Sequence, residues 1–103
     1  MTMPDLLPKF PEIDRIIHEP ARLAILTVLS SCREADFLFL QNATGLSKGN
    51  LSVQLTRLEE AGFIRIRKEI VAKKTRTTAL LSARGSREIA LYWKMMEKLR
   101  QGF

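Results

Sequence analysis

Cysteine and histidine are almost missing from this sequence of 103 residues, which has one of each, Cys32 and His18. A single cysteine excludes a disulfide within the chain and any metal site built from several cysteines. The two residues also stand at opposite ends of one predicted helix, about 20 Å apart, so they cannot share a metal ion. We therefore expect no metal or other cofactor. We expect Cys32 to be buried as a small apolar residue rather than to act as a redox switch.

Long apolar runs are missing too. The strongest, LAILTVL at residues 23–29, is far shorter than the roughly 18 residues that span a membrane. The amino-terminal residues MTMPDLLPKF carry prolines where a secretion signal needs an apolar segment. These features argue against a membrane as a partner, and with the single cysteine they favour a reduced, cytoplasmic location.

Catalytic motifs are a third absence. The sequence has no phosphate-binding loop, no paired catalytic carboxylates, and no nucleophile with a base placed by a motif. Internal repeats are also lacking, and the length is that of one domain. We therefore expect a single domain that is not an enzyme.

Acidic residues are scarce in one half of the chain. Residues 1–46 hold four Lys or Arg and six Asp or Glu, a balance of −2, whereas residues 47–103 hold thirteen and five, a balance of +8. A basic half on a small domain suggests a polyanion as partner, with nucleic acid first and an anionic membrane surface second. A solvated basic surface without a partner explains the charge alone equally well, because composition does not place residues in space.

The first third of the chain predicts an arm and two helices. Residues 1–11 contain three prolines and predict a flexible, extended amino-terminal arm. A short helix at residues 12–18 is expected next. Pro20 suits the first turn of another helix, which carries a broad apolar stripe and ends near Cys32. The polar residues 32–36 predict a loop.

The middle of the chain has clear start and stop signals. FLFLQNATG at residues 37–45 is short and apolar, so it fits a helix or a strand, and Gly45 is suited to a left-handed stop. Ser47 is a good amino-terminal cap. The helix that it opens, residues 47–61, aligns three leucines on one face and ends at Gly62. These leucines are Leu51, Leu55 and Leu58.

Alternating and β-branched residues follow. FIRIRKE at residues 63–69 and TRTTALL at residues 75–81 predict two strands. IVAKK between them lacks the Gly, Asn or Asp of a tight turn, so we expect a loose hairpin tip. Ser82 then caps a long helix that reaches about Gln101. The order predicts a mainly α (α+β) winged helix–turn–helix domain over residues 12–103, with three to four amino-terminal helices, a two-stranded β wing and a long carboxyl-terminal helix.

The face of the 47–61 helix opposite its leucines is small and polar, as entry into a DNA major groove requires. Asn50 or Gln54 could read adenine, and the methyl groups of Val53 could touch a thymine methyl. Lys48 and Arg57 could bind phosphate or guanine. The alternative is an ordinary solvated surface helix. The candidate DNA-binding residues of this helix are Ser47, Lys48, Gly49, Asn50, Ser52, Val53, Gln54 and Arg57.

The predicted hairpin is basic, with six Lys or Arg against one acid in residues 65–76. A basic hairpin can lie along the DNA backbone or in the minor groove. We expect Lys73, Lys74 and Arg76 to contact DNA. Arg65 and Arg67 are better suited to protecting an edge strand from aggregation.

Three segments together resemble a known family. HEPARLAIL, GLSKGNLSVQLTRLEEAGFIRIRKE and TRTTALLSARG, within residues 13–92, resemble compact winged-helix transcriptional regulators of bacteria and archaea, related to the MarR and ArsR types. The resemblance implies a homodimer that binds double-stranded DNA, with residues 47–61 as recognition helix, residues 63–81 as wing, and residues 82–101 in the dimer interface. Members often have histidine where Gln54 stands, which leaves the base read there open.

The last helix carries an apolar stripe that is too wide for one small domain to bury. We expect it to form a dimer interface, although some of its residues, Tyr92, Trp93, Met95 and Met96, could instead line a ligand pocket. The expected interface residues are Ile89, Tyr92, Trp93, Met96 and Leu99.

Function is thus predicted as sequence-specific regulation of transcription. The alternative is a winged-helix module for protein–protein contact, because a fold does not fix its function. Neither the operator nor any small-molecule effector follows from the sequence.

Overall fold

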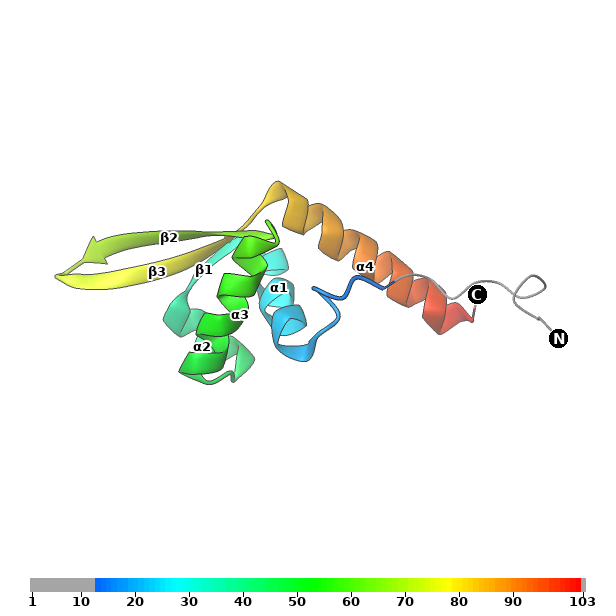
Figure 1. Ribbon diagram of the computed structural model, residues 1–103, viewed down its shortest axis with the longest axis horizontal. Coiled ribbons are helices and arrows are strands. Elements are labelled where there is room, and N and C mark those ends of the chain that lie inside the picture. The colour runs from blue at the N-terminus through cyan, green and yellow to red at the C-terminus, as the bar shows by residue number, and fades with distance from the viewer. Residues whose placement is uncertain (1–12, 103) are drawn as a thin grey trace.

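The structure, a computed structural model, describes residues 13–102 and shows a mostly helical winged-helix fold (Figure 1). The predicted mainly α fold with a β wing is confirmed. The arm expected at residues 1–11 lies outside the described residues. None of the helices between residues 13 and 102 has the length and hydropathy to cross a membrane. The elements in chain order are α1 (Pro20–Cys32), β1 (Glu34–Asp36), α2 (Phe37–Thr44), α3 (Lys48–Glu60), β2 (Ile64–Val71), β3 (Lys74–Leu81) and α4 (Ala83–Gln101).

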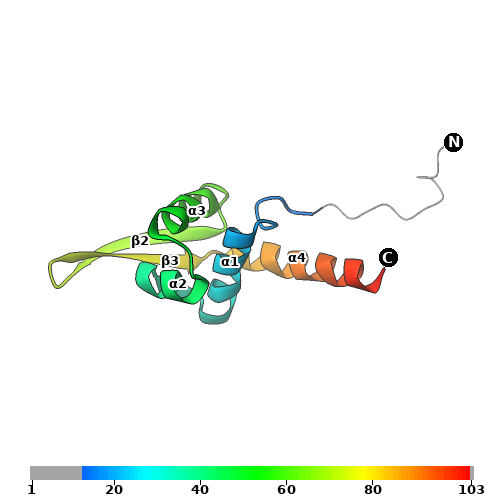
Figure 2. The same ribbon diagram turned by 90° about the horizontal axis from the view of Figure 1, so that it is seen from below.

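Helices α1, α2 and α3 form the body, from which the β2–β3 wing and α4 extend in opposite directions (Figure 1 and Figure 2). One apolar core joins these elements, and each large aliphatic side chain in it stabilises the fold by about 1.5–3 kcal/mol. The fully buried core side chains are Ile17, Ile25, Leu26, Leu29, Leu40, Leu51, Leu58 and Ile64.

Side-chain caps determine where the helices begin. The side chains of Ser47 and Ser82 accept hydrogen bonds from the backbone of α3 and α4, as predicted. Asp36 caps α2 in the same way, so residues 37–44 form a helix rather than a strand. Gly45 ends α2 with a φ of 74°, which confirms the predicted left-handed stop.

The sheet has three antiparallel strands in the order β1-β3-β2, one more than predicted. Residues 34–36, expected within a loop, pair with β3 through Glu34 opposite Leu80 and Asp36 opposite Thr78. Ala35, between them, is buried. This additional strand, β1, anchors the base of the wing to the helical body, because β1 lies between α1 and α2 in the chain.

The wing tip is tight, so the expected loose tip is wrong. Val71 pairs with Lys74, which leaves a turn of two residues. Both residues have positive φ, 52° at Ala72 and 66° at Lys73. This is the pattern of a type I′ turn, whose twist matches that of the strands. The long register of the hairpin holds these two residues in a backbone region that usually favours Gly or Asn.

Two further expectations are wrong. Residues 13–18, expected to be part of a helix, form a turn in which the Asp14 carboxylate accepts the backbone N–H groups of Ile16 and Ile17. Cys32, expected to be buried, is exposed. It lies at the last turn of α1, where its thiol contacts the Val28 carbonyl oxygen at 3.2 Å instead of entering the core.

The start of α4 lies directly on the turn that precedes β2. A Cβ atom placed on Gly85 would come within 2.1 Å of the Phe63 carbonyl oxygen, so only glycine permits this approach. The Ser82 backbone N–H donates to the same oxygen at 3.0 Å, and the Ser82 hydroxyl donates to the Gly62 carbonyl at 2.7 Å. These contacts fix the direction in which α4 leaves the sheet.

Candidate nucleic-acid interface

Helix α3 separates an apolar face from an open polar one. Leu51, Leu55 and Leu58 are at most 4% exposed and hold the helix on the core. The opposite face is exposed along the first turns, and nothing lies within 4 Å of a Cβ placed on Gly49. Half of the Val53 side chain is exposed. The predicted amphipathic division of this helix is therefore confirmed.

The amide side chains of this face are held by one another and by α1. Arg22 donates from Nη1 to Oε1 of Gln54 at 2.8 Å, and Nε2 of Gln54 donates to Oδ1 of Asn50 at 3.0 Å. Gln54 is consequently half-buried, while Asn50 is exposed. Sequence reasoning missed Arg22. No local signal marks it, because its partner is 32 residues away.

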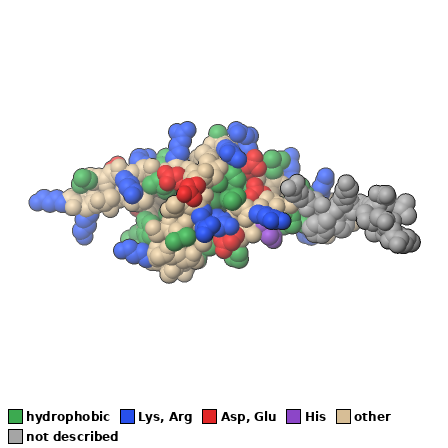
Figure 3. Space-filling model, viewed as in Figure 1, with side chains coloured by type: hydrophobic (Ala, Val, Ile, Leu, Met, Phe, Trp, Pro, Cys, Tyr) green, Lys and Arg blue, Asp and Glu red, His purple; other side chains and the backbone are tan. Residues whose placement is uncertain are grey.

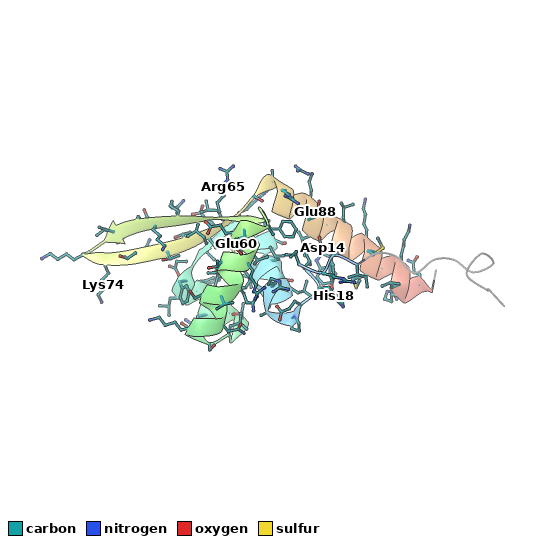
Figure 4. The ribbon with its side chains drawn as sticks, in the orientation of Figure 1. Asp14, His18, Glu60, Arg65, Lys74 and Glu88 are labelled. Carbon is teal, nitrogen blue, oxygen red and sulfur yellow. The ribbon has the colours of Figure 1, made fainter. Side chains whose placement is uncertain are left out.

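Acidic groups occupy only the far end of this helix. Glu59 and Glu60 are exposed in its last turn, and the acidic side chains gather there near the base of the wing (Figure 3 and Figure 4). A groove of about 440 Å³ runs between this end of α3, α2 and the wing, with Glu59 and Lys68 among its lining residues. The amino-terminal turns of α3 are thus free of negative side chains.

Most cations of the wing, including Arg65 and Lys68, form no ion pair with any residue from 13 to 102. Lys73, Lys74 and Arg76 are exposed and form no ion pair with any residue from 13 to 102. Lys74 lies at the wing tip, far from the helical body (Figure 4). Arg67, by contrast, pairs with Glu34 at 3.3 Å and Glu69 at 3.6 Å.

Arg65 lies on edge strand β2 and points away from the helices (Figure 4). Arg65 and Arg67 both lie on this edge strand, and their role in protecting it stays a prediction. Among residues 13–102, Arg67 is the wing cation that forms an ion pair, and three of the other five wing cations lie at residues 73–76, around the tip.

The residues of α4 expected to form the dimer interface fall into two groups that differ in exposure. Ile89 and Tyr92 are only 4% and 5% exposed because they pack in the core of their own chain. Trp93 is 47% exposed, and Met96 and Leu99 are half-buried. Leu91, absent from the predicted set, is 56% exposed. An apolar surface remains along α4, shifted from the predicted one.

Electrostatic effects along α4 are local. Burial raises the pKa of the Tyr92 hydroxyl. The hydrogen bond from Arg100 lowers the pKa of the exposed Glu97 carboxylate, and that carboxylate in turn raises the pKa of Arg100. Between residues 13 and 102, no three His, Cys, Asp or Glu side chains gather as a metal site.

A capped helix with an open polar face, packed next to a basic β-hairpin, is the arrangement of a winged helix. The chain belongs to the winged helix DNA-binding domain family, whose model matches residues 21–100. This confirms the resemblance to winged-helix regulators inferred from the sequence.

Individual proteins of similar structure or sequence are consistent with membership of this family. A transcriptional regulator homologue from Pyrococcus horikoshii OT3 superimposes with a TM-score of 0.80 at 27% identity, over 86% of this chain and 88% of that one. HlyU from Vibrio cholerae superimposes with a TM-score of 0.62 at 28% identity, over 79% and 84%. The protein MJ0432 of Methanocaldococcus jannaschii is 28% identical over 71 residues, which are 69% of this chain and 77% of that protein.

Proposed function

We propose that this protein is a sequence-specific DNA-binding regulator of transcription that acts as a homodimer. The observation that carries the proposal is the open, polar start of α3, together with exposed cations at the wing tip that form no ion pair with residues 13–102. Residues 48–57 enter a major groove, where small side chains allow close approach to base edges. Similarity to the Pyrococcus horikoshii transcriptional regulator homologue supports a role in transcription.

The wing supplies affinity and position. Lys73, Lys74 and Arg76 lie along the DNA backbone or reach into the minor groove, where each phosphate contact releases counterions. Such contacts carry little sequence information. Reading of bases is therefore assigned to α3 and backbone binding to the wing.

Helix α4 joins two copies of the chain. Its exposed apolar side chains, Leu91 and Trp93, favour burial against a partner. A symmetric pair places the two α3 helices in successive major grooves of a pseudo-palindrome, with half-sites about one turn apart. A single asymmetric site in a footprint would contradict this arrangement.

A fluorescence-anisotropy titration tests the proposal. Random-sequence DNA and fragments from upstream of genes are titrated over a series of salt concentrations. We expect tight binding to one upstream fragment, weaker binding to random DNA, and an affinity that falls steeply with salt.

The competing hypothesis is a winged helix used for protein–protein contact. It predicts no DNA binding even at low salt. It also predicts that partner binding survives reversal of charge at Lys73 and Lys74. A DNA-binding protein loses affinity after the same change.

A further inference from the structure

A chain of hydrogen bonds connects the first turn of α1 to the open face of α3. It runs from the Arg22 guanidinium through the Gln54 amide to the Asn50 amide, with donor–acceptor distances of 2.8 and 3.0 Å. Of the three residues, Asn50 is exposed, and Arg22 and Gln54 are half-buried. The exposed end of the chain lies among residues 48–57, the segment assigned above to the major groove.

The donor and acceptor at each of these hydrogen bonds follow from the side-chain types. A guanidinium can only donate, so the atom of Gln54 that faces Arg22 must be the oxygen. The other end of the Gln54 amide is then NH₂, which can only donate as well. It requires the oxygen of Asn50 as its acceptor. What Asn50 has left for an outside partner is its Nδ2 amino group.

The first member of the chain is firmly held. Arg22 also donates from Nε to the Ile16 carbonyl at 2.6 Å and from Nη2 to the Arg15 carbonyl at 3.4 Å. Its guanidinium therefore lies between α3 and the turn before α1. Turning the Asn50 amide over would set two NH₂ groups against each other and leave the Gln54 donor without an acceptor, which costs free energy.

The rest of the open face adds donors rather than acceptors. Lys48 and Arg57 can only donate. The hydroxyl of Thr56 donates to the Ser52 carbonyl at 3.1 Å. The Ser47 hydroxyl oxygen already accepts the Asn50 N–H at 3.1 Å. Up to the acids of its last turn, this face offers mainly hydrogen-bond donors.

We propose that Arg22 is a positioning residue for base specificity, and that Asn50 selects guanine rather than adenine. This proposal rests on the proposed DNA binding. In the major groove guanine presents two acceptors, N7 and O6, whereas adenine presents one acceptor and one donor. An Asn50 amide that offers only NH₂ satisfies guanine, and it leaves the adenine N6 amino group without an acceptor. The proposal replaces the adenine reading expected from the sequence.

The first step of the test locates the base. Preferred sites are selected from a random double-stranded library with the unaltered protein and with Asn50→Ala. The base pair whose preference disappears in Asn50→Ala is the one that Asn50 reads. We expect guanine there, preferred over adenine by about tenfold, the size of one good base contact.

The second step reverses the direction of the hydrogen bond between Gln54 and Asn50. Gln54→Glu replaces the NH₂ group with an oxygen, so Asn50 must turn its NH₂ inward and its oxygen outward. We expect the preference at the same base pair to change from guanine to adenine or cytosine, whose amino groups donate. Affinity for all sequences falls together because of the added negative charge. Gln101→Glu, in the last turn of α4, makes the same chemical change away from the proposed DNA-binding residues of α3 and the wing, and should keep guanine.

The third step removes the first donor of this series of hydrogen bonds. Arg22→Met removes the fixed donor, so both amides can rotate and guanine and adenine should bind within about twofold of each other. The salt dependence should stay unchanged, because no phosphate contact is lost. Thermal unfolding followed by circular dichroism shows whether the variant is folded, and Gln54→Glu provides the decisive comparison if it is not.

Three outcomes are distinguishable. A change of preference in Gln54→Glu with none in Gln101→Glu supports the proposal. Unchanged guanine preference in Gln54→Glu and Arg22→Met, or adenine preference in the unaltered protein, overturns it and leaves sequence-specific DNA binding intact. Equal binding of all sequences by the unaltered protein overturns the proposed function and this inference together.

Discussion

The Tyr92 hydroxyl lies 2.8 Å from Nδ1 of His18, and this hydrogen bond connects α4 to the turn that precedes α1. The two residues are 74 positions apart in the sequence. Neighbouring Ile17 is fully buried. The turn is thus fastened to the body by the apolar side chains of Ile13 and Ile17, by the bonds from Arg22 to its carbonyl groups, and by this contact with α4.

Tyr92→Phe removes that bond and should lower the free energy of unfolding by about 1 kcal/mol at neutral pH. Urea unfolding followed by circular dichroism measures the loss. His18→Gln should give a similar loss, because it removes the other partner. An unchanged midpoint in both variants would show that the bond contributes nothing to stability.

Ionisation of the same Tyr92 hydroxyl at high pH should lower the stability of the protein. Because burial raises the pKa of Tyr92, the folded state favours the neutral phenol. The free energy of unfolding that this preference adds is fully present below the ordinary tyrosine pKa of about 10. It is lost as the pH rises through the higher pKa of the folded state. The unfolding free energy of the unaltered protein should therefore fall more steeply above pH 10 than that of Tyr92→Phe. Parallel curves for the two proteins would contradict this.

Two glycines should respond to alanine with opposite signs. Gly85→Ala places a Cβ 2.1 Å from the Phe63 carbonyl oxygen and should destabilise the protein by about 2 kcal/mol or more. Gly49→Ala, in an open helical position, should stabilise it by about 0.5–1 kcal/mol. Thermal unfolding of both variants provides the comparison. Equal effects would mean that the close approach at Gly85 is absent.

The wing turn offers a stabilising change. Asn tolerates positive φ better than Ala, so Ala72→Asn should raise the unfolding free energy by about 0.5–1 kcal/mol. Ala43→Asn, on the exposed side of α2, should lower it slightly because Asn is the weaker helix former. If Ala72→Asn also lowers stability, the tip does not have the type I′ conformation.

Neutral wing variants should change how DNA affinity depends on salt. The double variant Lys73→Gln, Lys74→Gln should flatten the slope of log K against log salt concentration by about two units if both lysines contact phosphate. Lys94→Gln, on an exposed position of α4, is the control with an unchanged slope. The same slope in the double variant would remove the wing tip from the interface.

Trp93→Glu should dissociate the proposed dimer. A charge at this exposed apolar position on α4 resists burial against a second copy. Leu38→Glu changes a side chain that is 65% exposed on α2 and should leave the assembly unaltered. Sedimentation equilibrium distinguishes the two masses. A dimer that persists in Trp93→Glu, or a monomeric unaltered protein, would contradict the assignment of α4.

Features encoded by nearby residues were predictable from the sequence. Helix α3 follows from its cap at Ser47, its leucine spacing and Gly62, all within one short segment. The core of α1 and the cap of α4 at Ser82 were also evident. These signals are local because they depend on backbone groups or on one helical face.

The wrong or missing predictions depend on contacts between distant segments. Strand β1 has only three residues, and it exists because Leu80 and Thr78 are positioned to pair with it. The tight tip at Ala72 is imposed by the register of two eight-residue strands, against the preference of its own residues. The bond between Arg22 and Gln54 likewise depends on how α1 packs on α3. None of these contacts leaves a periodic pattern in the sequence.

The contact between Gly85 and the Phe63 carbonyl has a geometric consequence. It joins the root of α4 to the turn that follows α3 through backbone atoms, which do not change rotamer. In a pair of chains joined along α4, the separation of the two α3 helices is then set by rigid main chain. For the proposed dimer we therefore expect the number of base pairs between half-sites to be set by the fold. We expect substitutions on the surface of α4 to alter the strength of pairing without altering that spacing.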